Sequence, residues 1–158
     1  MGFSLSGVFD AMYWIIIALF IVINLVSLRF VTRPVTFNIG NHSTTLIFNL
    51  IAFLAYVTLI GVGASFTFAV VFAVVGLALG FGTGALSKVY TENSNVYLKR
   101  SLLVPMLALI AYVVSIYFAA FGGENLMSLG ILLVIGATGL SVGSSITEAF
   151  RASNVSHI

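Results

Sequence analysis

The sequence predicts an all-α integral membrane protein with five transmembrane helices, arranged as one transmembrane domain over residues 1–158. The first evidence for this prediction is the composition. Of the 158 residues, 61% are hydrophobic and only 6% are charged, whereas soluble domains are about one quarter charged. A chain of this composition cannot provide the polar surface that a soluble domain exposes to water.

Five apolar stretches supply the predicted spans. A helix needs about 20 apolar residues to cross about 30 Å of hydrocarbon. Stretches near this length lie at about Ala11–Leu28, Thr44–Val62, Phe66–Leu86, Leu102–Phe121 and Leu126–Ile146. They are called predicted spans one to five.

The charged residues assign an orientation to these spans. When the chain is threaded through all five, every cation falls on one face, and the other face carries Asp10 and Glu124. Cytoplasmic loops hold the positive charge of membrane proteins. We therefore expect a multi-pass protein of the cell membrane with its N-terminus outside and its C-terminus in the cytoplasm. The cations of the inner face are Arg29, Arg33, Lys88, Lys99, Arg100 and Arg151.

Predicted spans two to five resemble a duplicated pair of helices. When Thr45–Ile60 is aligned with Ser101–Ile116, six of 16 positions are identical, and Tyr56 falls on Tyr112. The sequence thus predicts a tandem helical-hairpin repeat, in which spans two and three match spans four and five. Repeats in the same orientation are related by an axis along the membrane normal.

Glycines recur on one face of spans three and five. Small residues allow the close backbone approach through which helices pack in lipid. The spacing predicts that spans three and five pack together or against a partner, and the alternative is a close-approach surface for a ligand or pore. The glycines concerned are Gly76, Gly80, Gly84, Gly136, Gly139 and Gly143.

A small β-hairpin is expected on the inner face. Lys88–Thr91 and Val96–Lys99 are rich in β-forming residues and flank the polar segment Glu92–Asn95, a pattern typical of a hairpin. Pro34–Ile39 could add a third strand, since an isolated hairpin is only marginally stable in water.

Polar side chains within the predicted spans are few and uncharged. Asn24 and Asn49 lie at similar depth and could hydrogen-bond each other across spans one and two; Tyr56 and Tyr112 are the other intramembrane polar positions singled out. The structural interpretation is hydrogen bonding between helices, and the functional alternative is the lining of a conduit. The absence of ionisable residues from the predicted spans disfavours a proton-coupled pump.

No catalytic, cofactor-binding or metal-binding residue is predicted. The chain has no cysteine, and His42 and His157 lie outside the predicted spans, whereas haem held across a bundle needs ligands inside them. His42 is interpreted as part of a helix start capped by Ser43 or Thr44. Glu148 and Arg151, three residues apart, are interpreted as a surface helix pair.

The order of these features resembles the CcdC-like group of small multi-span membrane proteins. The resemblance rests on the basic linker after span one, the glycine-rich segment 76–84, the hairpin segment 89–100 and the last span with its arginine-containing tail. It implies the same architecture. The group's name implies a link to cytochrome c maturation, a thiol chemistry for which this chain has no cysteine, so no functional residue is carried over.

The expected function is that of a non-catalytic accessory or structural subunit of a larger membrane complex of respiratory or oxidase type. The expected partners are the lipid bilayer and other membrane subunits. The basic balance needs no nucleic acid, because the inner-face cations would face anionic headgroups. The alternative is a small transporter or channel built on the parallel repeat. A membrane enzyme is the third class, without a supporting set of residues.

Overall fold

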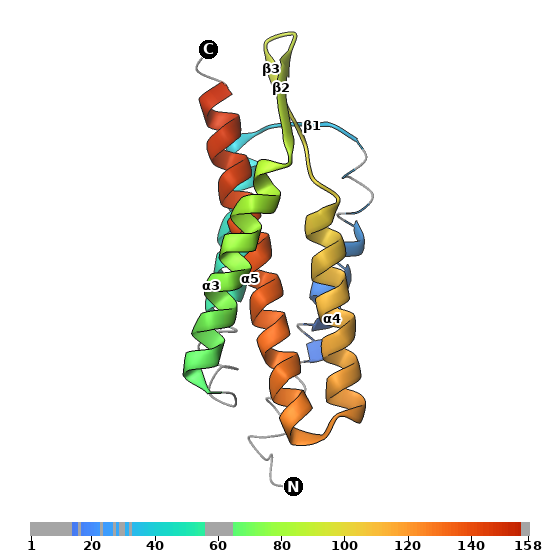
Figure 1. The fold of residues 1–158 in the computed structure, drawn as a ribbon. Helices are drawn as coiled ribbons and strands as arrows, with labels where there is room; N and C mark the ends of the chain where they lie inside the picture. The colour runs from blue at the N-terminus through green and yellow to red at the C-terminus, as the bar shows by residue number, and fades with distance from the viewer. Residues whose placement is uncertain are drawn as a thin grey trace, which may run out of the picture.

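The computed structural model describes residues 14–15, 17–22, 24–26, 28, 31, 33–55 and 65–155. The described residues between Trp14 and Val31 are helical. The elements that follow form a helical bundle with a small sheet at one end (Figure 1). In chain order they are β1 (Val35–Thr36), α2 (Ile39–Ala55), α3 (Phe66–Ala85), β2 (Lys88–Glu92), β3 (Asn95–Lys99), α4 (Leu103–Phe121) and α5 (Gly123–Val155).

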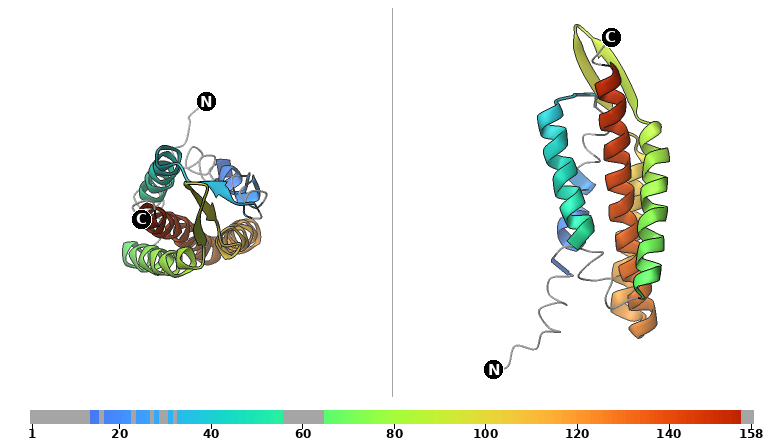
Figure 2. Two further views of the ribbon diagram at one scale, coloured as in Figure 1. Left: turned by 90° about the horizontal axis from the view of Figure 1, so that it is seen from above. Right: turned by 90° about the vertical axis from the view of Figure 1, so that its left-hand side faces the viewer.

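Helix α5 is the centre of the bundle. It packs against α2, α3 and α4, and the view along the bundle shows it between its neighbours (Figure 2). Its middle section combines fully buried Val134 and Ile135 with small residues such as Ala137 and Gly139. Small side chains keep the helix thin, so that neighbours can approach it from several sides.

The prediction of five transmembrane helices is wrong for this structure. Among the described residues, only α3 and the part of α5 from Leu126 to Val155 are long and apolar enough to cross a membrane. In α4 the apolar run is Leu103–Phe118, shorter than the roughly 20 residues that a span needs. In α2 the apolar run is His42–Leu54, and the described part of this segment ends at Ala55. Predicted span one and the end of predicted span two lie partly outside the described residues.

The helical-hairpin repeat is also wrong as a description of packing. Helix α4 packs along α5, but α2 packs against α5 and not against α3, which lies on the other side of α5 (Figure 2). The last helices of the two proposed copies differ in length, since α3 has 20 residues and α5 has 33. Tyr56, one of the two aligned tyrosines, lies outside the described residues. The aligned residues therefore reflect the shared composition of apolar helices.

The predicted hairpin is confirmed, and the predicted third strand joins it. The sheet has the order β1-β3-β2, and both pairs of strands are antiparallel. Its turn is shorter than expected, because Glu92 already pairs with Asn95. Asn93 and Ser94, with φ angles of 50° and 63°, form the two-residue connection; positive φ at both positions is the mark of a type I′ turn.

Replacing Ser94 by glycine should strengthen this hairpin. Glycine reaches positive φ without the steric cost that a Cβ atom imposes, so Ser94→Gly should raise local stability by about 0.5–1 kcal/mol. The measurement is hydrogen exchange of the cross-strand amides of β2 and β3. Thr91→Gly, within β2, is the control and should accelerate the same exchange; slower exchange in both variants would contradict the assignment of the turn.

Candidate functional site

The glycines singled out in the sequence lie where α3 meets α5. Gly76 faces the backbone of Gly136, and Gly80 faces the backbones of Leu140 and Gly143. A Cβ atom added at Gly84 would lie 2.8 Å from the carbonyl oxygen of Ser144. The two helices are therefore in direct backbone contact, which is closer than any larger residue permits.

Gly139 and Gly143 present the complementary side of the same contact. A Cβ atom on Gly139 would lie 2.9 Å from the carbonyl oxygen of Ala73, and one on Gly143 would meet the carbonyl oxygen of Leu77. Gly136 is less restricted, because its nearest neighbour would be the Phe72 carbonyl oxygen at 3.6 Å. A ligand or pore at this surface would need space that the two backbones already occupy.

Adding one methyl group at this contact should separate the helices. Gly80→Ala should destabilise the folded bundle by about 2 kcal/mol or more, since the new Cβ overlaps the backbone of α5. Gly82→Ala is the matched control on the same helix, because nothing lies within 4 Å of its added Cβ. That control should be neutral or stabilising by up to about 1 kcal/mol. Thermal unfolding in mild detergent compares the two, and equal midpoints would refute the contact.

A buried carboxylate lies at the sheet end of the bundle. Glu148 of α5 is 2% exposed. Its Oε1 accepts a hydrogen bond of 2.8 Å from the hydroxyl of Ser87, and its Oε2 lies 3.2 Å from Nε of Arg100. The same Ser87 oxygen accepts the N–H of Ser101 at 3.1 Å. One acidic side chain thus ties together α5, the link from α3 to β2 and the link from β3 to α4.

The interpretation of Glu148 and Arg151 as a surface pair is wrong. Glu148 faces inward and pairs with Arg100. Nη1 of Arg151 donates to the carbonyl oxygens of Ala85 and Ser87, each at 2.5 Å. Carbonyls at the C-terminus of a helix lack partners within the helix and carry partial negative charge. Arg151 therefore caps the end of α3 from the neighbouring helix.

The length of α5 explains why the sequence interpretation missed these roles. The predicted fifth span ends at Ile146, but α5 continues to Val155. Residues three and four apart share one face of a helix, so Glu148 continues the buried face that carries Ser144 and Ser145. The sequence feature that could have predicted the burial of Glu148 is its position four residues after Ser144 and three after Ser145, on the same helix face.

His42 connects α2 to α5. Its ring is buried, and Nε2 lies 2.9 Å from the carbonyl oxygen of Ser145. A carbonyl oxygen can only accept, so Nε2 donates this hydrogen bond. The helix begins at Ile39, where the side chain of Asn38 accepts the N–H of Gly40 at 2.9 Å. The cap predicted at Ser43 or Thr44 is therefore replaced by Asn38.

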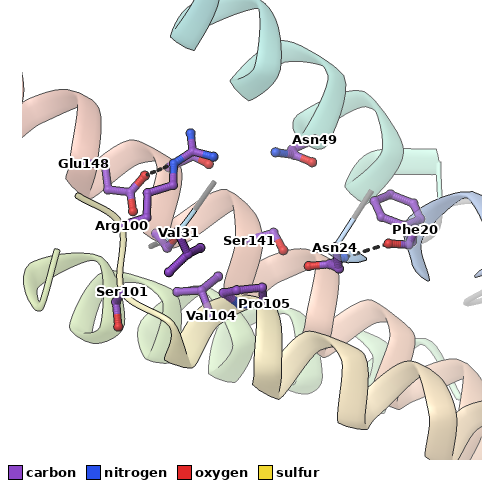
Figure 3. A pocket seen from close by; sticks show the side chains of 12 residues that line it. Phe20, Asn24, Val31, Asn49, Arg100, Ser101, Val104, Pro105, Ser141 and Glu148 are labelled. Carbon is purple, nitrogen blue, oxygen red and sulfur yellow. Dashed lines mark hydrogen bonds and ion pairs between the residues drawn. The ribbon is translucent and has the colours of Figure 1, made fainter. Parts of the chain in front are cut away.

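A pocket of about 90 Å³ lies beside this polar cluster, between α2, α4, α5 and the helical residues near Asn24 (Figure 3). Most of its lining side chains are polar. The lining residues are Phe20, Asn24, Val31, Asn49, Arg100, Ser101, Val104, Pro105, Ser141, Ser144, Ser145 and Glu148. This volume is several times what one water molecule needs.

Asn24 and Asn49 both line the pocket but do not bond each other. The amide nitrogen of Asn24 donates to the carbonyl oxygen of Phe20 at 2.8 Å. The side chain of Asn49 in α2 makes no hydrogen bond within the described part of the chain. Figure 3 shows the two amides on opposite sides of the space near Ser141. The asparagines therefore face a common space and form no direct bridge.

Tyr112 lies in the apolar core and not in the pocket. It is fully buried in α4, with its ring stacked on that of Phe20 at a centroid distance of 5.7 Å. Its hydroxyl finds no hydrogen-bond partner among the residues that the structure describes. The described residues also hold no group of three or more His, Asp or Glu side chains able to bind a metal ion.

Comparisons with known protein families, with curated proteins and with solved structures find no match to the chain.

The effects of substituting Arg100 and Glu148 on the free energy of unfolding should depend on each other. Arg100→Gln and Glu148→Gln should each cost about 1–3 kcal/mol, because each leaves one charged group without its partner. The double variant should cost less than the two single variants together, since neither charge then remains. Unfolding in detergent measures the cycle, and Lys99→Gln, an exposed neighbour, should change stability by less than about 0.5 kcal/mol. Strictly additive losses would exclude an energetic role for the pair.

Proposed function

We propose that the chain is an integral membrane protein, with α3 and α5 crossing the bilayer, and that it serves as a non-catalytic subunit of a larger membrane complex. The observation that carries the proposal is the distribution of side chains. Small and polar residues are buried between the helices together with an apolar core, and many further large apolar residues lie exposed on the outside. Such an exterior must be covered by lipid or by other apolar protein surfaces.

The outer faces show this distribution clearly. Helix α3 buries Ala69, Ala73 and its glycines but exposes Phe66 and Phe68, which are 67% and 59% accessible. Helix α2 exposes Phe48 at 70%. In water this arrangement would leave apolar area exposed along most of the bundle. Each Å² of that area costs about 25 cal/mol of free energy relative to burying it.

The placement of charge supports a cytoplasmic sheet end. Helices α3 and α5 run in the same direction and both end beside the sheet, while α4 runs in the opposite direction on the side of α5 away from α3 (Figure 1). The sheet and its links carry Arg33, Lys88, Lys99 and Arg100. The opposite end carries aromatic side chains, with Tyr117 close to Phe118 and Phe121. Positive charge marks the cytoplasmic side, and aromatic residues gather at membrane interfaces.

Labelling of introduced cysteines tests this orientation. The chain has no cysteine of its own, so each single variant gives one signal. Phe121 is 78% exposed at the α4–α5 junction, and Ser94 is exposed in the hairpin turn. An impermeant thiol reagent applied to intact cells should label Phe121→Cys and spare Ser94→Cys. Labelling of Ser94→Cys in sealed cells would reject the assignment, and permeabilised cells provide the control in which both react.

The subunit role predicts a complex of fixed composition. Extraction in mild detergent should yield the chain with a partner in constant ratio. Phe68→Ala and Phe48→Ala remove exposed side chains without touching the core. At least one of them should reduce the partner ratio while leaving the unfolding midpoint unchanged. A chain that runs alone on native gels, and is unaffected by either variant, would count against the subunit role.

A small transporter is the second candidate, and the pocket is the observation that favours it. The charged pair at Arg100 and Glu148 borders a polar space inside the bundle. Charged residues in such positions mark solute or ion paths in many membrane proteins. Solute flux into vesicles containing only this chain, lost in Asn49→Leu, would favour transport over the subunit role.

A further inference from the structure

We infer that the pocket beside Arg100 binds one anionic phosphate group, either on a lipid headgroup or as a free anion. The inference does not depend on the proposed subunit role, because it concerns a site within the chain itself. It rests on the donors around the pocket, their burial and their free hydrogen-bonding capacity.

Arg100 is the principal donor. Its Nε faces Glu148, and Figure 3 shows its two terminal nitrogens pointing away from that carboxylate. A guanidinium group has five N–H donors in a fork that matches phosphate or carboxylate oxygens. Within the described residues the terminal nitrogens make no hydrogen bond. The ion pair thus orients the side chain and leaves its phosphate-binding edge available.

Two buried hydroxyls add further donors. Ser144 and Ser145 line the pocket and are only 4% and 7% exposed. Neither hydroxyl has a hydrogen-bond partner among the described residues. Both hydroxyls are therefore available to a ligand in the pocket. Ser141 differs, because its hydroxyl already donates to the carbonyl oxygen of Ala137 at 3.2 Å.

The first turn of α4 supplies a third favourable element. Val104 and Pro105 line the pocket next to the start of this 19-residue helix. The N-terminus of a helix carries partial positive charge and so favours anions; here the charge is the contribution, because Pro105 has no N–H and that of Leu103 already bonds the Ser101 hydroxyl. Glu148 opposes an anion, but both of its oxygens are already engaged by Ser87 and Arg100.

The position and size of the pocket fit a phosphate group. Arg100 lies between β3 and α4, at the end of the bundle where we place the cytoplasmic headgroups. Anionic lipids are abundant in that leaflet. A volume of about 90 Å³ is sufficient for a phosphate group. Four phosphate oxygens could accept from the guanidinium and the two serine hydroxyls together.

The test uses the purified full-length chain in an uncharged detergent and two probes. Inorganic phosphate is titrated by calorimetry, and phosphatidic acid is counted by native mass spectrometry, with diacylglycerol as its counterpart lacking the phosphate. We expect one saturable phosphate group per chain. Binding of inorganic phosphate assigns the site to a free anion, whereas binding of phosphatidic acid alone assigns it to a lipid headgroup; either result supports the inference.

Substitutions locate the binding. Arg100→Gln should weaken it at least about tenfold, as expected for loss of a charge-assisted pair of hydrogen bonds. Arg33→Gln is the matched control, because Arg33 is exposed and outside the pocket, and it should change affinity by less than about twofold. The Ser144→Ala/Ser145→Ala double variant leaves the ion pair intact and should weaken binding by about threefold to tenfold.

Three results would overturn the inference. The first is that neither probe saturates a single site, the second that Arg33→Gln weakens binding as much as Arg100→Gln, and the third that diacylglycerol binds as tightly as phosphatidic acid. Should Arg100→Gln fail to fold, the double serine variant decides the question. Unchanged binding in that folded variant also refutes the site, whereas the subunit and transport experiments are unaffected by any of these outcomes.

Discussion

The backbone contact between α3 and α5 is the constraint on which the rest of the structure depends. In lipid, apolar side chains gain little by leaving one apolar environment for another, so helix association relies on close packing and hydrogen bonds. Facing glycines such as Gly80 and Gly143 let two backbones touch along several turns. With α3 held there, the other helices pack on the remaining sides of α5.

Polar contacts at the sheet end fix the sliding and rotation of the helices, which the glycine contact does not restrict. Smooth backbones can slide along or rotate about each other, because dispersion forces have little directionality. Directed polar contacts join α5 to three neighbouring segments. From α5, Glu148 pairs with Arg100 and Arg151 donates to the end of α3. From α2, His42 donates to the carbonyl oxygen of Ser145 in α5. These bonds set the register of the helices, and they place the sheet over the end of the bundle. The pocket arises where these directed contacts hold α2 and α4 apart.

Local patterns in the sequence predicted the short-range structure well. The bounds expected for the third and fourth spans differ from α3 and α4 by about one residue at each end, and the β-forming segments form the expected sheet. Packing partners were less predictable. Apolar composition shows that a segment is helical and avoids water, but it does not show which neighbour the helix contacts. The repeat failed for this reason, since helices with similar residues pack differently.

The candidate site was partly visible and partly hidden in the sequence. Asn24 and Asn49 were identified because amides are rare in apolar segments, and the structure places both at the pocket. Glu148 was assigned to the surface because it lies three residues from Arg151, a spacing typical of an exposed helix pair. Its burial is possible only because Ser87 and Arg100, 61 and 48 positions away in the chain, supply partners. No local pattern reports such distant partners.

The central position of α5 has a consequence for biosynthesis. Helix α5, against which α2, α3 and α4 pack, is synthesised after all three, since it begins at Gly123. Chains are synthesised from the N-terminus, and early segments fold before later ones appear. Helices α2, α3 and α4 therefore emerge before the helix that they share as a packing partner. Glu148 lies near the end of α5, so the polar contacts with Ser87 and Arg100 at the sheet end can form only after most of this helix has been synthesised.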